Sequence, residues 1–271
     1  MLVYAIINQK GGVGKTTTTA NLGAALALAG KRILLLDMDP QGSLTAAVGR
    51  TTGALSIGDV LREPETILNA IQRAAGEMHL ISATATLSNV FRELDALEAP
   101  AFRLAKALEC VQECYDYALI DCPPTLGHAT TNAMTAAHVA LIPLQCEFLS
   151  LRGLSDVEEI AVAIRQATNP DLRLRVVGTM YDRRTLHANE VLQAARTAFP
   201  GLVYETIIPR TVRLAEAPAH AQTIFEYAPE STGAYAYSLL AQEVLQEDTN
   251  LATSGRYSLG GTHSARLPEA A

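Results

Sequence analysis

The stretch KGGVGKTT, from Lys10 to Thr17, decides the fold class of this chain. Its last residues match the G-K-[ST] that ends the phosphate-binding loop G-x-x-x-x-G-K-[ST]. An apolar, β-branched run, VYAIIN at residues 3–8, precedes it and is typical of a strand buried on both faces. The alanine- and leucine-rich residues 16–29 that follow predict a helix, which stops at Gly30. Strand, glycine-rich loop and helix in this order predict a nucleotide-binding α/β domain.

Each part of the loop has a predicted role in binding phosphate. The glycines allow backbone angles that other residues resist, so successive N–H groups can converge on phosphate oxygens near a helix N-terminus. Lys15 is expected to reach the β- and γ-phosphates, and the Thr16 hydroxyl to ligate Mg²⁺. Lys10 is one lysine more than the usual loop requires, and it adds a fixed charge at the mouth of the loop. The predicted nucleotide-binding residues of the loop are Lys10, Gly11, Gly12, Val13, Gly14, Lys15, Thr16 and Thr17.

Apolar runs alternate with helical patterns along the whole chain, as a parallel sheet covered by helices on both faces requires. The sequence therefore predicts an α/β fold, a doubly wound and mostly parallel sheet of the P-loop NTPase type. No linker divides the chain, so we predict one domain over residues 1–248 and a flexible tail over residues 249–271, where Gly, Ser and Thr dominate. Strands are predicted at 3–8, 32–37, 79–82, 117–121, 139–144, 175–180 and 203–207, and helices at 16–29, 100–114, 151–166 and 232–246.

Composition indicates a soluble, cytoplasmic protein. Hydrophobic residues make up 49% of the chain, yet no apolar run approaches the roughly 20 residues that span a membrane. The N-terminus begins in the first predicted strand, without a signal-peptide pattern. Cys110 and Cys114 could hold a metal, but burial as small apolar side chains is favoured because no His or further Cys pair lies at zinc-site spacing. We expect all four cysteines to be reduced and structural.

Three aspartates lie at or just after the ends of predicted strands. Ligands of open α/β sheets bind outside the carboxyl ends of the strands, so Asp37, Asp39 and Asp121 are expected to converge on the phosphate loop. Asp121 ends the run YALID and is predicted to hold a magnesium-bound water; a capping aspartate at a strand end is the alternative. Asp37 is predicted to support the metal or the loop lysine.

The loop and three later segments together resemble the deviant Walker A ATPases of the ParA/Soj group, which are relatives of MinD. The later segments are DMDPQG at residues 37–42, LIDCPP at 119–124 and IPRTVRLAEAP at 208–218, so the resemblance covers nearly the whole chain. It implies a Mg²⁺-dependent ATPase that is slow without partner and DNA. It also implies that Lys15 acts in hydrolysis and that Asp39 positions or activates the attacking water.

The resemblance further implies a homodimer with ATP sandwiched between the subunits. Lys10 then reaches across to the partner's phosphates and acts in hydrolysis, so dimerisation and nucleotide state become one equilibrium. Gly12 lies where the two loops would approach. Glu147 is expected to touch ribose across the interface, with a simple surface glutamate as the alternative. The residues that match segments flanking adenine in relatives, through backbone contacts, are Met180, Pro209 and Arg210.

The formal net charge of −7 argues against a protein coated for nucleic acid. Eight arginines but only four acids nevertheless lie between Arg165 and Arg213, and solvated helix faces explain this equally well from charge alone. The resemblance implies a DNA surface, because Arg184 and Arg213 match positions that contact DNA in Soj-type proteins. Such contacts are to phosphate, hence nonspecific and sensitive to salt. The chain departs from the family pattern at residues 183–186, RRTL, so DNA affinity is expected to be weaker or carried by arginine.

Several functions stay open. The first is a partition ATPase that binds nonspecific DNA as an ATP-bound dimer, associates with the nucleoid, and is released when a ParB/Spo0J-like centromere-binding protein stimulates hydrolysis. A MinD-like membrane-cycling ATPase needs a basic amphipathic C-terminal helix, whereas residues 242–248 hold three acids and no base, so no membrane partner is expected. A nucleotide-gated scaffold with negligible turnover is the non-enzymatic alternative. An iron–sulfur reductase is disfavoured because paired cluster cysteines are lacking.

Overall fold

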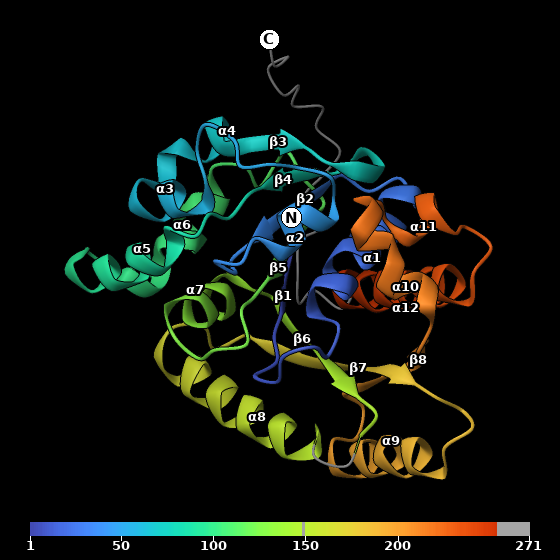
Figure 1. Ribbon diagram of the computed structural model, residues 1–271. Helices are drawn as coiled ribbons and strands as arrows, with labels where there is room; N and C mark the ends of the chain where they lie inside the picture. Colours follow the sequence, from blue (N-terminus) through green and yellow to red (C-terminus); the bar gives the residue numbers. More distant parts are fainter. Residues whose placement is uncertain (148–149, 254–271) are drawn as a thin grey trace.

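An eight-stranded sheet runs through the molecule in the order β3-β4-β2-β5-β1-β6-β7-β8 (Figure 1). The structure is a computed structural model that describes residues 1–147 and 150–253. Neighbouring strands are parallel except β3 and β4 at one edge, which confirms the predicted mostly parallel, doubly wound fold. The strands are β1 Leu2–Ile6, β2 Ile33–Asp37, β3 Ile71–Arg73, β4 His79–Ile81, β5 Tyr117–Asp121, β6 Val139–Gln145, β7 Arg173–Tyr181 and β8 Val203–Pro209.

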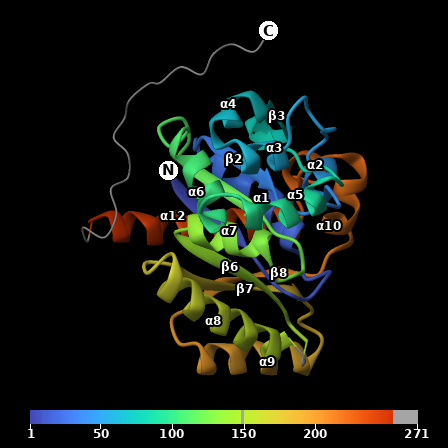
Figure 2. The same ribbon diagram turned by 90° about the vertical axis from the view of Figure 1, so that its left-hand side faces the viewer.

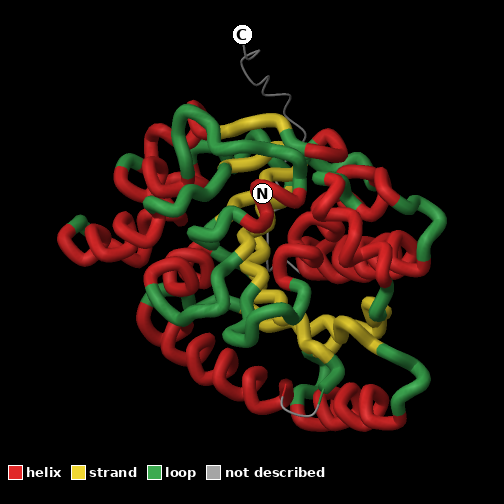
Figure 3. Tube along the Cα trace, in the orientation of Figure 1, coloured by secondary structure: helices red, strands yellow, loops and turns green. Residues whose placement is uncertain are grey.

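Helices cover both faces of the sheet (Figure 2). One buried apolar cluster joins α1, α2 and α10 to α12 to one face, and a second joins α3 to α9 to the other. Figure 3 shows the yellow strands running between these red helical layers. The helices are α1 Lys15–Leu28, α2 Ser43–Ala47, α3 Ile57–Arg62, α4 Ile67–Ala70, α5 Leu87–Glu93, α6 Arg103–Glu109, α7 His128–Ala136, α8 Ser150–Ala167, α9 Leu186–Ala198, α10 Val212–Glu216, α11 Ile224–Tyr227 and α12 Thr232–Thr253.

The central strands bring the expected site residues to one edge of the sheet. Every residue of β1, β2 and β5 is buried, which is why these strands are continuous apolar runs rather than alternating ones. Asp121 at the end of β5 lies level with Ile6 of β1 and with Asp37 of β2. The phosphate loop leaves β1 at this same edge. The carboxyl ends of the three strands therefore surround the loop.

Some element predictions were incomplete or wrong. Strand β3 was not predicted, because its three partly exposed residues at the sheet edge are too few to form a pattern. The helix predicted over residues 100–114 is shorter: a 3₁₀ turn precedes α6, which ends at Glu109. Cys110 is consequently exposed rather than buried, and Cys114 is only partly buried. Cys122 and Cys146 are buried as predicted, and all four thiols are free.

Helix α12 is longer than predicted. It continues to Thr253, so the domain boundary at residue 248 and a flexible tail from residue 249 were wrong. The Thr249 hydroxyl donates to the Leu245 carbonyl at 2.7 Å, a local bond that lets a polar residue continue the helix. The remainder of the predicted tail, residues 254–271, lies outside the described residues.

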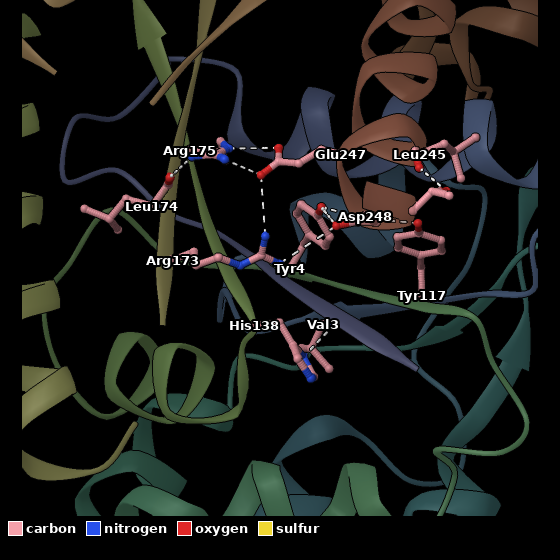
Figure 4. Close-up of polar contacts among 11 residues, drawn as sticks. Val3, Tyr4, Tyr117, His138, Arg173, Leu174, Arg175, Leu245, Glu247 and Asp248 are labelled. Carbon is pink, nitrogen blue, oxygen red and sulfur yellow. Dashed lines mark hydrogen bonds and ion pairs between the residues drawn. The ribbon is translucent and has the colours of Figure 1, made fainter. Parts of the chain in front are cut away.

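Acidic residues fasten the end of α12 to the sheet (Figure 4). Asp248 is buried and accepts hydrogen bonds from the hydroxyls of Tyr4 and Tyr117, at 2.9 and 3.0 Å. The preceding residue, Glu247, pairs with two arginines of β7, Arg173 and Arg175. The helix is thus tied to β1, β5 and β7 at the sheet edge opposite the phosphate loop.

Candidate active site

The phosphate loop leads from β1 directly into α1, which begins at Lys15. Gly12 and Gly14 have φ angles of 76° and 91°, which residues with a Cβ rarely adopt. A Cβ placed on Gly11, Gly12 or Gly14 would meet no atom beyond its immediate neighbours within 4 Å. The chain's own packing therefore leaves the space over these glycines open. The N-terminus of a 14-residue helix borders this space and favours an anion there.

The first residues of α1 meet Asp121 at the end of β5. Thr16 Oγ1 donates to Asp121 Oδ2 at 2.7 Å, and Lys15 Nζ donates to the backbone oxygen of Lys10 at 3.2 Å. Burial and the charge of Asp37 raise the pKa of Asp121 to about 8, and burial lowers the pKa of Lys15. A nearby cation would favour the ionised form of Asp121. The structure therefore brings Lys15, Thr16 and Asp121 together, as predicted.

Asp37 and Asp39 have different surroundings. The buried Asp37 carboxylate accepts hydrogen bonds from the Thr45 N–H and hydroxyl, at 2.8 and 2.7 Å, and from the Asp39 N–H at 3.1 Å. Burial raises the pKa of Asp37 to about 6. Asp39 is only partly buried and accepts a hydrogen bond from the Gln41 N–H at 2.9 Å. Asp37 thus holds the segment that carries Asp39, while metal support by Asp37 and water positioning by Asp39 stay predictions.

Lys10 contacts Glu147 of its own chain. Lys10 Nζ lies 3.0 Å from Glu147 Oε2, and Gln145 Nε2 donates to Glu147 Oε1 at 2.7 Å. The side chains of Lys10 and Glu147 are 41% and 56% exposed. Two residues expected at a dimer interface are therefore paired with each other in the single chain. Their contacts with a partner's phosphate and ribose stay predictions.

A cavity of about 1250 Å³ opens beside the loop, between β7, β8, α10 and α12. Gly14 and Thr17 border it on the side of the loop. Met180 has a φ of 51°, a left-handed conformation that is uncommon for a residue with a side chain and is often found at functional sites. The residues predicted to flank a base all line this cavity: Met180, Pro209 and Arg210. The base contact itself stays a prediction.

These groups fit a nucleoside triphosphate with Mg²⁺. The glycine-rich loop and Lys15 suit phosphate, and Thr16 and Asp121 offer the oxygen ligands that Mg²⁺ prefers. No cluster of three or more His, Cys, Asp or Glu that could hold a metal occurs among the described residues. This agrees with Mg²⁺, which is usually held by one or two carboxylates together with substrate phosphates.

The arginine-rich segment is less available than its composition suggests. Half of its arginines are engaged within the domain: Arg165 donates to the Leu172 carbonyl, Arg173 and Arg175 pair with Glu247, and Arg196 pairs with Glu205. Glu247 lies outside the sequence window in which charges were counted. The local excess of positive charge therefore does not form one continuous surface. The arginines that are exposed are Arg183, Arg184, Arg210 and Arg213.

The two predicted DNA-contact residues are exposed, and each is paired with an acid. Arg184 is 84% exposed and donates to both carboxylate oxygens of Asp182, at 2.9 and 2.8 Å. Arg213 is 61% exposed and lies 3.1 Å from Glu216. Exposed pairs of this kind contribute little stability, so DNA phosphate could compete for both arginines. DNA contact by Arg184 and Arg213 stays a prediction.

Comparison with known proteins decides the family. Residues 1–174 match a family profile described as an AAA domain. The chain is 43% identical over 246 residues to the sporulation initiation inhibitor protein Soj of Bacillus subtilis, covering 89% of this chain and 97% of Soj. It is 42% identical over 252 residues to the chromosome partitioning protein ParA of Caulobacter vibrioides, covering 91% and 94% of the two chains. The chain belongs to the Soj/ParA family of chromosome-partitioning ATPases. The predicted family is confirmed.

Solved structures confirm the fold of this Soj/ParA-type ATPase. A structure of cobyrinic acid a,c-diamide synthase from Mycobacterium smegmatis, with bound ADP and magnesium, has a TM-score of 0.80 and 37% identity, covering 94% of this chain and 97% of the other. MinD from Pyrococcus horikoshii, complexed with Mg-ADP, has a TM-score of 0.73 at 24% identity, covering 91% and 97%, and shows likeness of fold alone. No helix among the described residues has the length and apolar character needed to cross a membrane.

Sequence reasoning missed two threonines that support the Soj/ParA-type site. The Thr45 hydroxyl bonds Asp37 and also accepts from the Ala83 N–H at 3.2 Å. The Thr179 hydroxyl, on β7, donates to the backbone oxygen of Val13 in the phosphate loop at 2.9 Å. Threonine is common in strands for its branched shape alone, so the sequence carried no signal for either bond.

Proposed function

We propose that this protein is a DNA-partition ATPase whose ATP-bound homodimer binds nonspecific DNA. A ParB-like centromere-binding partner stimulates hydrolysis and thereby releases the dimer from DNA. The observation that carries the proposal is the phosphate loop with its additional Lys10, beside Asp121, in a chain 43% identical to Soj. Without partner and DNA, Mg²⁺-dependent hydrolysis is slow.

The site residues divide the work of hydrolysis. Lys15 and the loop N–H groups bind phosphate, and Thr16 with Asp121 holds Mg²⁺, directly or through its water. The bound ion offsets charge on the phosphate oxygens. Asp39 orients the attacking water, since its carboxylate is partly exposed and bonded only to the Gln41 N–H among the contacts of the described chain. Phosphoryl transfer needs positioning and charge stabilisation more than covalent catalysis, so these roles suffice.

Dimerisation changes the partner of Lys10. In the single chain Lys10 pairs with Glu147 in an exposed contact of the kind worth about 0–1 kcal/mol. A triphosphate of the second subunit carries more negative charge, and water exclusion at the interface strengthens its attraction for a cation. Lys10 therefore leaves Glu147 when two ATP-bound subunits meet, and Glu147 is free to reach ribose. ATP thereby controls dimerisation.

DNA binding uses Arg184 before α9 and Arg213 in α10. Both guanidinium groups are exposed, and each subunit of a dimer adds its own pair. The formal net charge of −7 limits the interaction to this small surface, which makes affinity sensitive to salt. A single subunit offers too few phosphate contacts for strong binding, so DNA affinity depends on the ATP-bound dimer.

The protein works in the cytoplasm and on the nucleoid rather than at a membrane. Glu243 accepts hydrogen bonds from the N–H groups of Glu205 and Thr206 in β8, and Glu247 and Asp248 bond to the sheet. All three acids near the end of α12 therefore hold this helix in the fold. This part of α12 lacks the free basic face that a membrane-binding helix of the MinD type requires.

A DNA titration tests the proposal. Binding of a mixed-sequence duplex is measured with ATP, with ADP and without nucleotide, each over a range of salt concentrations. We expect binding with ATP alone, and affinity that falls steeply with salt. Equal binding in all three nucleotide states would reject the partition cycle. Binding to anionic lipid vesicles in place of DNA would favour the MinD-like alternative.

Phosphate release separates the partition ATPase from the nucleotide-gated scaffold. It is measured with DNA and with a ParB-like partner, alone and together. Stimulated release is expected for the partition ATPase. DNA binding with no release under any of these conditions would instead indicate a scaffold.

A further inference from the structure

We propose that Thr179 is a positioning residue for the phosphate loop: its buried hydroxyl fixes the peptide between Val13 and Gly14. Thr179 lies in β7 and is 2% exposed, and its Oγ1 donates to the Val13 backbone oxygen at 2.9 Å. Val13 is itself 1% exposed. A hydrogen bond between groups this deeply buried is shielded from competition with water. It connects the loop to a strand 166 positions away in the sequence.

The bond acts on one peptide plane. In a trans peptide the C=O and the following N–H point in opposite directions, and none of the described peptide bonds is cis. The Val13 carbonyl is held toward β7, so the Gly14 N–H is directed away from β7. Gly14 has a φ of 91° and no side chain to restrict its rotation. The hydroxyl of Thr179 supplies the restraint that the glycine lacks, and it presets an N–H of the loop for phosphate.

Thr179 also joins the loop to two other parts of the site. Its backbone oxygen accepts a hydrogen bond from the Cys146 N–H at 3.2 Å, one residue before Glu147, which holds Lys10. The next residue in β7, Met180, lines the cavity beside the loop. One strand end therefore contacts the phosphate loop, the segment that pairs with Lys10, and the cavity predicted to receive the base.

The inference rests on nucleotide binding within the proposed function and is independent of DNA binding and dimerisation. Without the hydroxyl, the Val13–Gly14 peptide can rotate, and nucleotide must select the competent orientation from several. Affinity should then fall, because only part of the protein is competent at any time. The loss applies equally to bound substrate and to the hydrolytic transition state, so KM rises while kcat is unchanged.

Three variants of the full chain test the inference. Thr179→Val removes the hydroxyl at nearly constant shape, and Thr179→Ser keeps the hydroxyl. Thr135→Val is the matched control, because the buried Thr135 hydroxyl bonds Thr168 at 2.9 Å on α7, away from the loop. Affinities for Mg-ADP and Mg-ATP are measured by titration, together with KM, kcat and the thermal unfolding midpoint without nucleotide.

We expect Thr179→Val to bind both nucleotides roughly tenfold more weakly, the change that corresponds to one hydrogen bond of ordinary strength. Thr179→Ser and Thr135→Val should bind like the wild type, even where Thr135→Val lowers the unfolding midpoint as much as Thr179→Val does. Wild-type affinity in Thr179→Val overturns the inference. So does Thr179→Ser binding as weakly as Thr179→Val, because packing rather than the hydroxyl would then be responsible.

If Thr179→Val does not fold, Thr179→Ala removes the same hydroxyl without adding bulk and is judged by the same results. The outcome is also distinct from that of the partition proposal. A wild-type protein that binds Mg-ADP but never DNA would reject partition and leave the role of Thr179 intact. Weakened Mg-ADP binding in Thr179→Val, with normal wild-type DNA binding, would support both.

Discussion

Neighbouring carboxylates after β2 have separable tasks at the scale of single residues. Asp39 is partly exposed and bonded to the Gln41 N–H, whereas Asp37 is buried within a network around Thr45. Asp39→Ala should therefore keep the fold, nucleotide binding and dimerisation. Its stimulated hydrolysis rate should fall by about 10²–10⁴-fold, the usual contribution of a group that orients or activates a reacting water. Phosphate release and Mg-ATP titration measure the two effects.

Lys15→Ala is the comparison variant for Asp39→Ala. Removing Lys15 takes away the charge that contacts phosphate, so ATP binding itself should be lost. A wild-type hydrolysis rate in Asp39→Ala would reject a catalytic role for this aspartate. Weak ATP binding in both variants would give Asp39 a role in binding instead.

Residues of the loop could be predicted from the sequence because they are contiguous. Gly14, Lys15 and Thr16 form a pattern in which spacing alone fixes the chemistry. The contacts that support the loop are not contiguous: Thr179 lies 166 positions from Val13, and Glu147 lies 137 positions from Lys10. Only the order of strands in the sheet brings such pairs together.

At the scale of elements, the anchor of α12 should make stability depend on pH. Burial raises the pKa of Asp248 to about 6, despite the hydrogen bonds from Tyr4 and Tyr117. Because this pKa is above its unfolded value of about 4, the folded state binds the proton more tightly. The resulting stabilisation is fully present below about pH 4 and is lost as the pH rises through about 6. Its upper limit is about 3 kcal/mol.

Asp248→Asn should remove this pH dependence. The asparagine oxygen can still accept from the tyrosine hydroxyls, but the side chain does not ionise. Free energies of unfolding are measured in denaturant from pH 4 to pH 7, and the difference between wild type and variant is plotted. Glu98→Gln, which alters an exposed acid, is the control for the loss of one charge. A difference that stays constant between pH 4 and pH 7 would contradict the assignment.

Elements were predicted well from the sequence where they are fully buried. Strands β1, β2 and β5 are continuous apolar runs because helices cover both of their faces. The extension of α12 was missed because its last residues are polar, and their helical state depends on contacts made by Asp248 with distant strands. Local composition does not report such tertiary contacts.

At the scale of the whole molecule, the DNA surface is predicted to depend on two arginines per subunit. Arg184→Glu combined with Arg213→Glu should abolish DNA binding and leave Mg-ATP affinity unchanged. Both side chains are exposed and pair only with nearby acids, so the fold should be kept. Arg73→Glu combined with Arg92→Glu makes the same change of charge at two exposed residues elsewhere and should retain DNA binding. Duplex titration at several salt concentrations distinguishes the pairs; equal loss in both would indicate net charge rather than a site.

The assembly itself should depend on Lys10. The Lys10–Glu147 pair of the single chain is exposed, and its removal should leave the loop and its Mg-ATP affinity intact. Lys10→Ala should nevertheless neither dimerise with ATP nor hydrolyse it, because the cation that reaches the second subunit's phosphates is missing. Glu147→Gln releases Lys10 from its cis partner and should still dimerise. Sedimentation with ATP and with ADP measures both; a normal ATP-dependent dimer of Lys10→Ala would show that the additional lysine acts only within its own subunit.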